Sequence, residues 1–336
     1  MTEWWIAPLV VLASFLMTEG LRRYALAKSI IDVPNARSSH AVPTPRGGGV
    51  AIVVSFLLAL VALGAMGLLT LPLVLGLAGG GGLIALIGFM DDHGHIAARW
   101  RLLGHFIAAG WGLFWLNGLP PVTLFGVEVD LGWGGAIVAA LYLVWLLNLY
   151  NFMDGIDGIA SVEAISVCLG ACLLYWISGF EQLMVLPMIL ILSVSGFLYW
   201  NFPPAKIFMG DAGSGFLGIV LGLLSLQAAW ASSQLFWCWL ILLGVFVVDA
   251  TFTLIRRLVR GERVYEAHRS HGYQFASRRA GGHLPVTLAV LFLNVCWLLP
   301  VAVFVVLFDL DGFIGLLVAY LPLVFLAVAC NAGGRE

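Results

Sequence analysis

The sequence predicts an all-α polytopic membrane protein with a single domain, and three observations support this prediction. Of 336 residues, 62% are hydrophobic and only 10% are charged, whereas about 25% are charged in an ordinary soluble domain. The mean hydropathy of +1.03 does not fit a water-facing surface. Apolar runs of roughly 18 or more residues recur along the chain, each long enough to cross about 30 Å of hydrocarbon. In lipid such runs must satisfy their own backbone hydrogen bonds, so they are predicted to be helices.

The apolar runs define eleven predicted spans, and we expect a bundle of about 10–11 transmembrane helices. In chain order the spans are 4–21, 48–67, 70–89, 103–118, 134–150, 159–178, 184–200, 214–230, 235–255, 284–306 and 313–330. Inside the third span, the run Gly79–Gly82 favours close packing against a neighbouring helix rather than phosphate binding. After the fourth, residues 123–130 alternate apolar and polar side chains, which predicts a small hairpin.

All the basic residues lie on one side of this predicted topology. The odd-numbered connections and the C-terminal tail hold all 16 Lys and Arg residues, whereas the opposite connections carry only acids. A wrong span count would have scattered the basic residues over both sides, so this segregation also supports the helix assignment. Under the positive-inside rule the N-terminus is predicted to lie outside and the basic loops in the cytoplasm. We expect a multi-pass protein of the bacterial inner membrane.

Five aspartates lie at predicted cytoplasmic helix ends, each near glycine. Ionisable groups there indicate function, because burying them in lipid is costly. Adjacent carboxylates repel one another unless a cation holds them, and carboxylate oxygens together with substrate phosphates are the usual ligands of Mg²⁺. The cluster therefore predicts a divalent-metal site, with Mg²⁺ as the expected cofactor and Mn²⁺ as the alternative. Its members are Asp91, Asp92, Asp154, Asp157 and Asp211.

Two predicted cytoplasmic loops carry histidine and arginine. In the last loop, His268 and His271 would share one face of a helix, where they could bind phosphate oxygens or relay a proton. The same basic loop could equally contact anionic lipid. The first loop contains Arg37, His40 and Arg46, and it is interpreted either as an ordered loop over a polyanion site or as a linker that sets the topology.

These motifs together resemble the MraY/WecA family of polyprenyl-phosphate N-acetylhexosamine-1-phosphate transferases. The matching stretches span most of the chain in family order, and all lie on the predicted cytoplasmic face. They are DVPNARSSHAVPTPRGGG (32–49), GFMDD (88–92), NLYNFMDGIDGIA (148–160), NFPPAKIFMGDAGSGFLG (201–218) and HRSHGYQ (268–274).

The resemblance implies a multi-helical bundle with an active-site cleft at the cytoplasmic face. It further implies a Mg²⁺-dependent transfer of N-acetylhexosamine-1-phosphate from a UDP-sugar to undecaprenyl phosphate, with release of UMP. Such a reaction initiates the synthesis of O-antigen or another cell-surface polysaccharide. The implied partners are the UDP-N-acetylhexosamine, undecaprenyl phosphate, membrane lipids and, by family precedent, a second copy in a homodimer. Nucleic acid is not an expected partner.

The resemblance also assigns candidate site residues. The implied catalytic residues are Asp91, Asp92, Asp211, His268 and His271, with Asp211 and Asp92 as the implied metal ligands. Asp91 or Asp92 would deprotonate or orient the lipid phosphate, while the histidine loop would neutralise developing charge. The candidate substrate-binding residues are Asn151, Asp154, Asp157, Phe208, Arg37, Arg46, Arg99, Arg101 and Arg269.

Two departures from the family pattern bear on the substrate. MraY-type proteins carry a Lys near the position of His95 and three consecutive histidines where this chain has His-Arg-Ser-His. The chain is therefore more similar to the O-antigen-initiating, WbpL-like branch. A phospho-MurNAc-pentapeptide transferase stays the alternative within the family. UDP-N-acetylglucosamine, UDP-FucNAc and UDP-QuiNAc all stay open as donors.

A transporter and a non-catalytic scaffold are the alternatives from other classes. A transporter would place ionisable residues near the bilayer centre. Here the acids predicted to lie within helices, Glu19, Glu163 and Asp249, are placed toward the inner ends. A scaffold would not need five aspartates beside histidine-rich loops.

Overall fold

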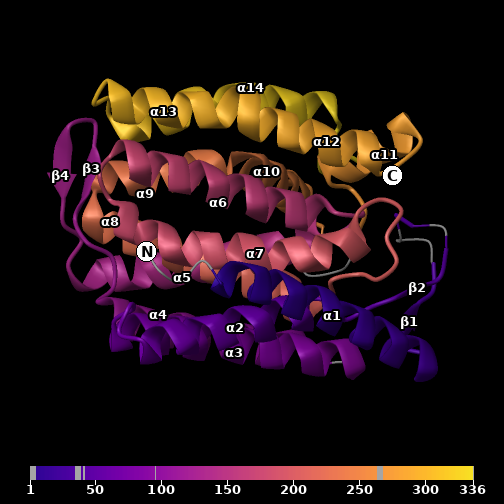
Figure 1. Cartoon of the computed structure of the whole chain (residues 1–336). Helices are drawn as coiled ribbons and strands as arrows, with labels where there is room; N and C mark the ends of the chain where they lie inside the picture. The colour runs from indigo at the N-terminus through magenta and orange to yellow at the C-terminus, as the bar shows by residue number, and fades with distance from the viewer. Residues whose placement is uncertain (1–4, 35–38, 41, 95, 263–267, 336) are drawn as a thin grey trace.

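The computed structural model describes residues 5–34, 39–40, 42–94, 96–262 and 268–335. Within them the chain forms long helices that lie side by side, with two short hairpins at their ends (Figure 1). The helices are α1 (Ile6–Ala27), α2 (Val50–Ala65), α3 (Leu71–His93), α4 (Ala98–Leu116), α5 (Trp133–Met153), α6 (Ile159–Ile177), α7 (Val185–Asn201), α8 (Asp211–Ala231), α9 (Ser233–Leu242), α10 (Gly244–Val259), α11 (Gly272–Ala280), α12 (Leu284–Leu293), α13 (Leu299–Leu307) and α14 (Gly312–Ala329). The strands are β1 (Ile31–Asp32), β2 (Thr44–Pro45), β3 (Val122–Leu124) and β4 (Val127–Val129).

Each of the eleven predicted spans contains a helix, and the all-α membrane class is confirmed. By length and apolar composition, however, the described chain has seven candidate membrane spans rather than ten or eleven. An eighth is present if α9 and α10, which meet at a 69° bend, are one span. Of the remaining helices, α2 is short, and α1 and α4 carry charged residues among their apolar ones. The seven are α3, α5, α6, α7 with its preceding turn, α8, the segment from α12 to α13, and α14.

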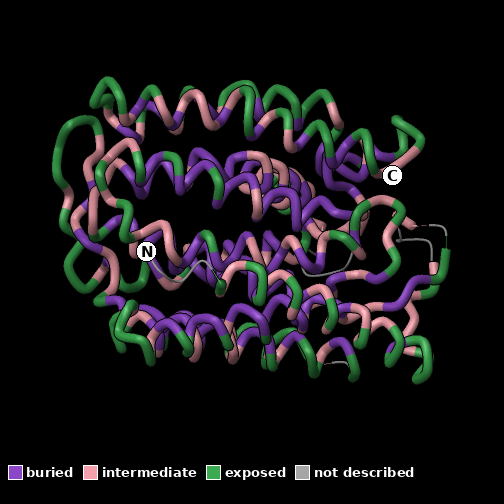
Figure 2. The backbone as a smooth tube through the Cα atoms, in the orientation of Figure 1, coloured by how far each residue is buried: buried purple, intermediate pink, exposed green. Residues whose placement is uncertain are grey.

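Helix α8 forms the centre of the bundle. Nearly all of its residues are buried, because α3, α5 and α9 pack closely around it. Figure 2 shows that buried positions run through the middle helices, while exposed positions follow the outer ones. A helix that is apolar on every face is stable only when it is enclosed in this way.

The glycine run in α3 packs as the sequence predicts. A Cβ atom at Gly79 would collide with the indole of Trp111 on α4, and one at Gly81 would lie 2.7 Å from Phe216 on α8. The small residues therefore allow α3 to approach both neighbours closely. The Trp111 Nε1–H also donates to the Leu75 carbonyl at 2.8 Å, which ties α4 to α3.

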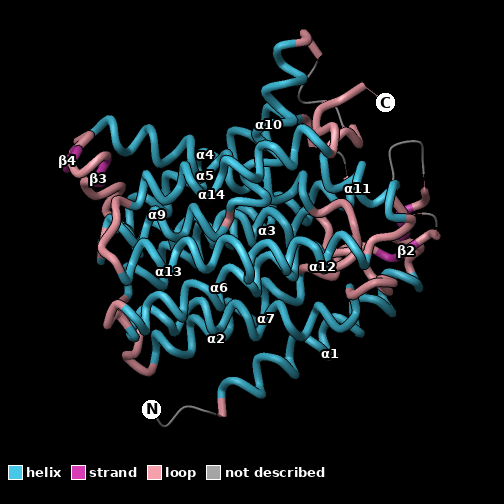
Figure 3. The backbone as a smooth tube through the Cα atoms, turned by 90° about the horizontal axis from the view of Figure 1, so that it is seen from above, coloured by secondary structure: helices cyan, strands magenta, loops and turns pink. Residues whose placement is uncertain are grey.

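The two ends of the bundle differ, as the view from above shows (Figure 3). At one end β3 and β4 pair antiparallel, with Thr123 opposite Glu128, which confirms the predicted hairpin. At the other end lie α11, the C-terminus and the pair β1–β2, in which Ile31 lies opposite Pro45. We call this the α11 end. All five aspartates of the predicted cluster lie at this end, because α3 and α5 end there and α6 and α8 begin there.

Candidate active site

The start of α8 and the end of α3 approach each other so closely that only glycine fits between them. A Cβ atom at Gly88 would lie 2.5 Å from the Asp211 carbonyl oxygen. Gly210 has a φ of +78°, and a Cβ atom there would lie 2.7 Å from Asp92 Oδ2. Glycine supplies both the unusual backbone angle and the missing side chain. The sequence FMGDAG thus brings the carboxyl groups of Asp92 and Asp211 into one place.

Asp92 is a buried carboxylate that holds the first turn of α8. Its Oδ1 accepts a hydrogen bond from the Asp211 N–H at 3.3 Å, and its Oδ2 accepts one from the Ala212 N–H at 3.4 Å. These amides have no partner within their own helix, and a carboxylate is favoured at this positive end of the helix dipole. Arg46 donates to the Asp92 carbonyl, and its guanidinium lies 4.0 Å from Asp92 Oδ1. Asp92 therefore positions the backbone that carries Asp211.

The carboxylate of Asp211 is itself oriented by two neighbours. Its Oδ1 accepts from the Asn151 side-chain amide at 2.9 Å, and its Oδ2 lies 3.7 Å from the Arg101 guanidinium. The same amide donates to the Ser214 hydroxyl at 2.9 Å. Arg101 also pairs with Asp91, which accepts a further bond from the Ile96 N–H at 2.8 Å. Arg101 thus links the two carboxylates across the site.

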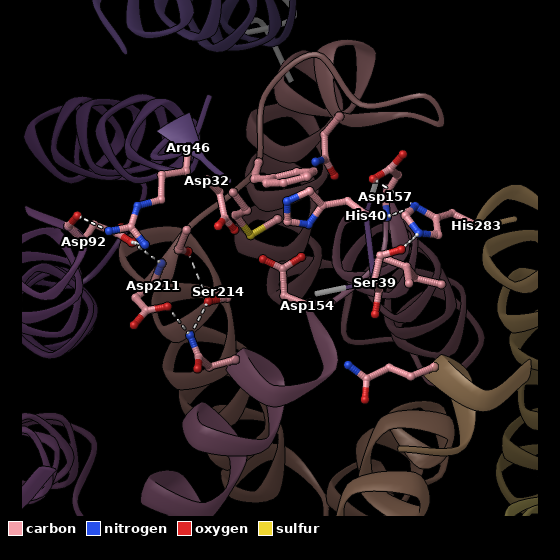
Figure 4. A pocket seen from close by; sticks show the side chains of 18 residues that line it. Asp32, Ser39, His40, Arg46, Asp92, Asp154, Asp157, Asp211, Ser214 and His283 are labelled. Carbon is pink, nitrogen blue, oxygen red and sulfur yellow. Dashed lines mark hydrogen bonds and ion pairs between the residues drawn. The ribbon is translucent and has the colours of Figure 1, made fainter. Parts of the chain in front are cut away.

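A polar pocket of about 390 Å³ opens beside Asp211 (Figure 4). Seven of the residues predicted from sequence line it: Arg46, Asp92, Asn151, Asp154, Asp157, Phe208 and Asp211. Other polar residues that line it were not predicted as site residues: Asp32, Ser39, His40, Asn201, Ser214, Gln274 and His283. Six of these seven lie within the stretches that carry the resemblance, although they were not singled out there, and only His283 lies outside those stretches.

Two further cavities meet the polar pocket at Asp211. An apolar-walled pocket of about 200 Å³ lies between α3, α4, α5 and α8, and its polar lining includes Asp91, Arg101 and Asn151. A more open cavity of about 400 Å³, which we call the mouth, is lined by Arg46, Asp91, Asp92, His93, Gly94 and Asp211. Among the described residues, Asp211 alone lines all three cavities.

Asp154 projects into the polar pocket without a hydrogen-bond partner among the described side chains and amides (Figure 4). Burial raises the pKa of its carboxyl group well above the ordinary value, and the nearby carboxylates of Asp211, Asp92 and Asp157 raise it further. A cation bound in the pocket would oppose both effects and favour the ionised form.

The donor set at this junction fits a Mg²⁺ ion that also binds its substrate. The described residues contain no group of three His, Cys, Asp or Glu side chains placed to hold a metal alone. Mg²⁺ usually takes only one or two carboxylates and completes its shell with waters and substrate phosphates. Asp211, whose side chain is 38% exposed, and the unpartnered Asp154 supply such carboxylates. The oxygens of Asp92 instead face the α8 amides.

Asp157 and His283 clamp the far side of the polar pocket. His283 Nδ1 lies 3.0 Å from Asp157 Oδ1, and its Nε2 lies 3.0 Å from the Ser39 carbonyl oxygen. The other oxygen of Asp157 accepts from the Ala205 N–H at 3.0 Å. The hydrogen bond to Asp157 and the Ser39 carbonyl raise the pKa of His283, although burial opposes them. His283 therefore joins the start of α6, the start of α12 and the first loop.

This clamp should make stability depend on pH. The folded-state pKa of His283 lies above its ordinary value of 6.5, so its stabilising effect is complete below pH 6.5 and is lost as the pH rises through the folded pKa. We expect the melting temperature of the purified protein to fall over that pH range. In His283→Gln the decrease that is due to His283 should be absent, because Gln keeps a hydrogen-bond donor but carries no charge. Melting curves in detergent at constant ionic strength would check this. Parallel pH profiles for the two proteins would contradict it.

The two predicted catalytic histidines lie behind the polar pocket and not in its lining. The His271 ring stacks on His268, with centroids 4.8 Å apart, and lies 6.4 Å from the ring of Phe152. Burial, with help from His271 and Arg257, lowers the pKa of His268 to about 3. His268 is therefore neutral here, and it can accept or relay a proton but does not supply a positive charge.

Helix α11 connects these histidines to the pocket through its first turn. Asp249 on α10 accepts from the Gly272 N–H at 2.9 Å and the Tyr273 N–H at 2.8 Å, and His271 Nδ1 lies 3.3 Å from the same carboxylate. The Tyr273 hydroxyl donates to the Phe152 carbonyl at 3.0 Å, and Gln274 reaches the polar pocket. Asp249 thus fixes the helix that packs against the loop after α5.

The remaining predicted arginines have different positions. Arg101 is in the site, whereas the guanidinium of Arg99 lies over the Trp100 ring, 5.7 Å from its centroid, and lines none of the three cavities. The Arg269 carbonyl accepts from Arg278 at 3.1 Å, next to the histidine pair. Arg37 lies outside the described residues.

Other proteins are similar in sequence to this chain over most of its length. Residues 74–229 match the model of a family described as glycosyl transferase family 4. A probable undecaprenyl-phosphate N-acetylglucosaminyl 1-phosphate transferase of Bacillus subtilis is 31% identical over 269 residues, 78% of this chain and 73% of the relative. An undecaprenyl-phosphate alpha-N-acetylglucosaminyl 1-phosphate transferase of Thermotoga maritima is 28% identical over 83% of this chain and 84% of its own. A phospho-N-acetylmuramoyl-pentapeptide-transferase of Moorella thermoacetica is 32% identical over 66% of this chain and 75% of its own.

Proposed function

Since the chain belongs to the polyprenyl-phosphate N-acetylhexosamine-1-phosphate transferases of glycosyl transferase family 4, we propose that it transfers N-acetylhexosamine-1-phosphate from a UDP-sugar to undecaprenyl phosphate and releases UMP. One observation carries this proposal most directly. The polar pocket, the apolar-walled pocket and the mouth all meet at the Asp211 carboxylate. A transfer between a water-soluble donor and a lipid acceptor needs such a junction, because the two phosphates must meet at one point.

The polar pocket suits the nucleotide-sugar. Its volume of about 390 Å³ lies within the range of small-molecule sites. Phe208 offers an aromatic surface for the base, and the His40 ring meets it edge-on with centroids 4.8 Å apart. Gln274 lines the same pocket, and its side-chain oxygen is held by the His271 N–H, which leaves its amide N–H groups as donors that suit the hydroxyls or acetyl oxygen of an N-acetylhexosamine.

The apolar-walled pocket suits the lipid phosphate. Arg101 and Asn151 stand at its polar side, whereas Ile84, Leu102 and Leu147 form apolar walls. Further along α4 and α5, toward the β3–β4 end, a second apolar groove of about 690 Å³ includes Phe106, Gly110, Leu113, Phe114, Ile137 and Leu141 in its lining. An isoprenoid chain lying along α4 and α5 would keep its phosphate beside Arg101 and its tail in hydrocarbon.

The proposed chemistry rests on positioning and charge neutralisation, because an anionic phosphate must approach an anionic diphosphate. Arg101 neutralises charge where the two phosphates meet, and Asn151 and Asp92 hold Asp211 in place. A Mg²⁺ ion held by Asp211 and Asp154 would stabilise negative charge on the phosphate oxygens. The second pKa of a phosphate monoester is near 6, so the acceptor is largely ionised at neutral pH. We therefore favour direct attack, with Asp91 orienting Arg101 and not acting as a nucleophile.

We further propose that the α11 end faces the cytoplasm and that the N-terminus lies outside the inner membrane. The segregation of the Lys and Arg residues supports this orientation. A homodimer is the assembly that family precedent favours. Initiation of a cell-surface polysaccharide is the proposed pathway role, and an O-antigen product stays a prediction.

The test is UMP release by purified protein in detergent with undecaprenyl phosphate and Mg²⁺. UDP-N-acetylglucosamine, UDP-FucNAc, UDP-QuiNAc and UDP-MurNAc-pentapeptide would be offered separately. We expect UMP from an N-acetylhexosamine donor only when lipid and metal are both present, with Mn²⁺ tested as a replacement. UMP from UDP-MurNAc-pentapeptide alone would reassign the chain to the peptidoglycan branch. No UMP from any donor, with the protein shown to be folded, would overturn the proposal.

A further inference from the structure

A separate crevice of about 290 Å³ lies at the α11 end, between α10, α11, α12 and α14. It shares no lining residue with the polar pocket, the apolar-walled pocket or the mouth. Its lining is almost wholly apolar, and its single carboxylate belongs to Asp249, whose oxygens accept from the α11 amides. The crevice is therefore not part of the substrate site described above.

The crevice has a buried floor and an exposed rim. The side chains of Val286, Val290, Leu323 and Ala327 are buried at its floor. Its rim includes Leu326, which is 44% exposed, together with the exposed Ala280, Pro285 and Ala289. Because α12 and α14 belong to candidate membrane spans, the rim opens toward hydrocarbon. An acyl chain is the apolar group that surrounds such an opening in a membrane.

Positive charge lies beside the rim at its polar end. Arg278 and Arg279 are exposed at the end of α11. Arg279 directly precedes Ala280, which lines the crevice at its rim. Basic side chains at a membrane surface attract anionic lipid headgroups electrostatically. A lipid whose chain fills the crevice would place its headgroup against these arginines.

We propose that this crevice binds one acyl chain of an anionic phospholipid, with the phosphate of the headgroup at Arg279. Gly272 and Tyr273, in the first turn of α11, form part of the crevice wall. A bound chain fills space behind that turn and braces the helix that carries Gln274 to the polar pocket. The lipid binding does not depend on the proposed transferase reaction, so each can fail without the other.

Native mass spectrometry of the detergent-purified protein tests the binding. Phosphatidylglycerol or phosphatidylcholine would be added, and the retained lipid counted after mild activation. We expect one phosphatidylglycerol to be retained in preference to phosphatidylcholine. Ala289→Trp fills the rim and should lower that retention at least about 5-fold, which corresponds to about 1 kcal/mol. Leu288→Trp adds the same ring at an exposed neighbouring position outside the crevice and should leave retention unchanged. Arg279→Gln should remove the preference for phosphatidylglycerol.

Hydrogen exchange provides the second measurement. Phosphatidylglycerol should slow amide exchange in the first turn of α11 in the unmodified protein and in Leu288→Trp, but not in Ala289→Trp. Equal lipid retention by Ala289→Trp and Leu288→Trp would overturn the proposal. So would loss of a dimer mass in Ala289→Trp with lipid retention unchanged, because a second copy of the chain would then occupy the crevice. If Ala289→Trp fails to fold, Leu326→Trp fills the same rim from α14 and takes its place.

Discussion

Replacing Asp211 with Asn should lower UMP release by about 1,000-fold while the protein stays folded. Asn keeps the shape of the side chain and can still accept from Asn151, so the main loss is one negative charge at the point where three cavities meet. Stabilisation of phosphate charge by a bound metal contributes several kcal/mol, and each 1.36 kcal/mol corresponds to about tenfold in rate. Initial-rate UMP assays over a range of Mg²⁺ concentrations would measure the loss.

The matched control for this variant is Asp130→Asn, which removes a carboxylate from the opposite end of the bundle. Asp130 accepts from the Gly132 N–H in a surface turn and lines none of the three cavities at the α11 end. Its activity should match that of the unmodified protein. If Asp211→Asn kept more than about a tenth of the rate at saturating Mg²⁺, the charge of Asp211 would contribute less than 1.4 kcal/mol, and the metal assignment would be wrong.

Replacing Asp249 with Ala should lower kcat by about 100-fold even though Asp249 lines none of the three site cavities. The substitution removes the acceptor for the Gly272 and Tyr273 amides and for His271. The first turn of α11 then loses its anchor, and with it the contact from Tyr273 to the Phe152 carbonyl. Misplacement of a positioning element by about 1 Å costs about 100-fold in rate. Steady-state kinetics should show the loss mainly in kcat.

The Asp249→Ala variant should also melt at a lower temperature, because buried amides left without an acceptor cost about 1–3 kcal/mol each. Glu163→Gln is the control that separates a loss of stability from a loss of catalysis. Glu163 is another buried carboxyl group, which accepts from Asn294 at 2.6 Å between α6 and the α12–α13 segment, far along the chain from α11. It should change stability but leave kcat within about twofold at temperatures where the protein is folded. A kcat for Asp249→Ala equal to that of Glu163→Gln would remove Asp249 from the positioning of the site.

The helices and the location of the site were predictable because both follow from local sequence. Long apolar runs identify helices in lipid. The basic residues show which connections between helices lie together at one end of the bundle. The motif containing Asp211 was recognisable for the same reason, since its glycines and acid are adjacent in the chain. The hairpin at 123–130 also follows from neighbouring residues. The glycine run in α3 was recognisable because its four glycines are adjacent in the chain, although the helices that it packs against are distant in sequence.

The residues that were missed are brought to the site by contacts between distant segments. His283 pairs with the Asp157 carboxylate across 126 positions, and Asp32 reaches the pocket through the pairing of β1 with β2. Gln274 lies in the predicted histidine loop, but nothing in its spacing shows that it would face the pocket while His268 would not. Asp249 was seen only as an acid within a span. Its role depends on α11 folding back against α10.

The bend between α9 and α10 was also missed, for a physical reason. Residues 235–255 form one apolar run, and a hydropathy pattern does not register a change of direction within such a run. The structure places Leu243 between the two helices and turns the chain by 69°. Sharp bends need a local break in the hydrogen-bond ladder, and here α10 begins again at Gly244. The turn brings Asp249 to α11.

The glycine contacts between α2, α3 and α8 limit how this protein can diversify. Any side chain added at Gly49, Gly88 or Gly213 would collide with backbone or with Met209, so mutation cannot reshape this wall without displacing Asp211. The opposite wall contains Ser39 and Gln274, which come from a loop and the start of a helix, where exchange is tolerated more readily. We therefore expect relatives that use different sugars to vary on the loop wall and to keep the glycine wall unchanged. An effort to alter the donor should begin with Gln274.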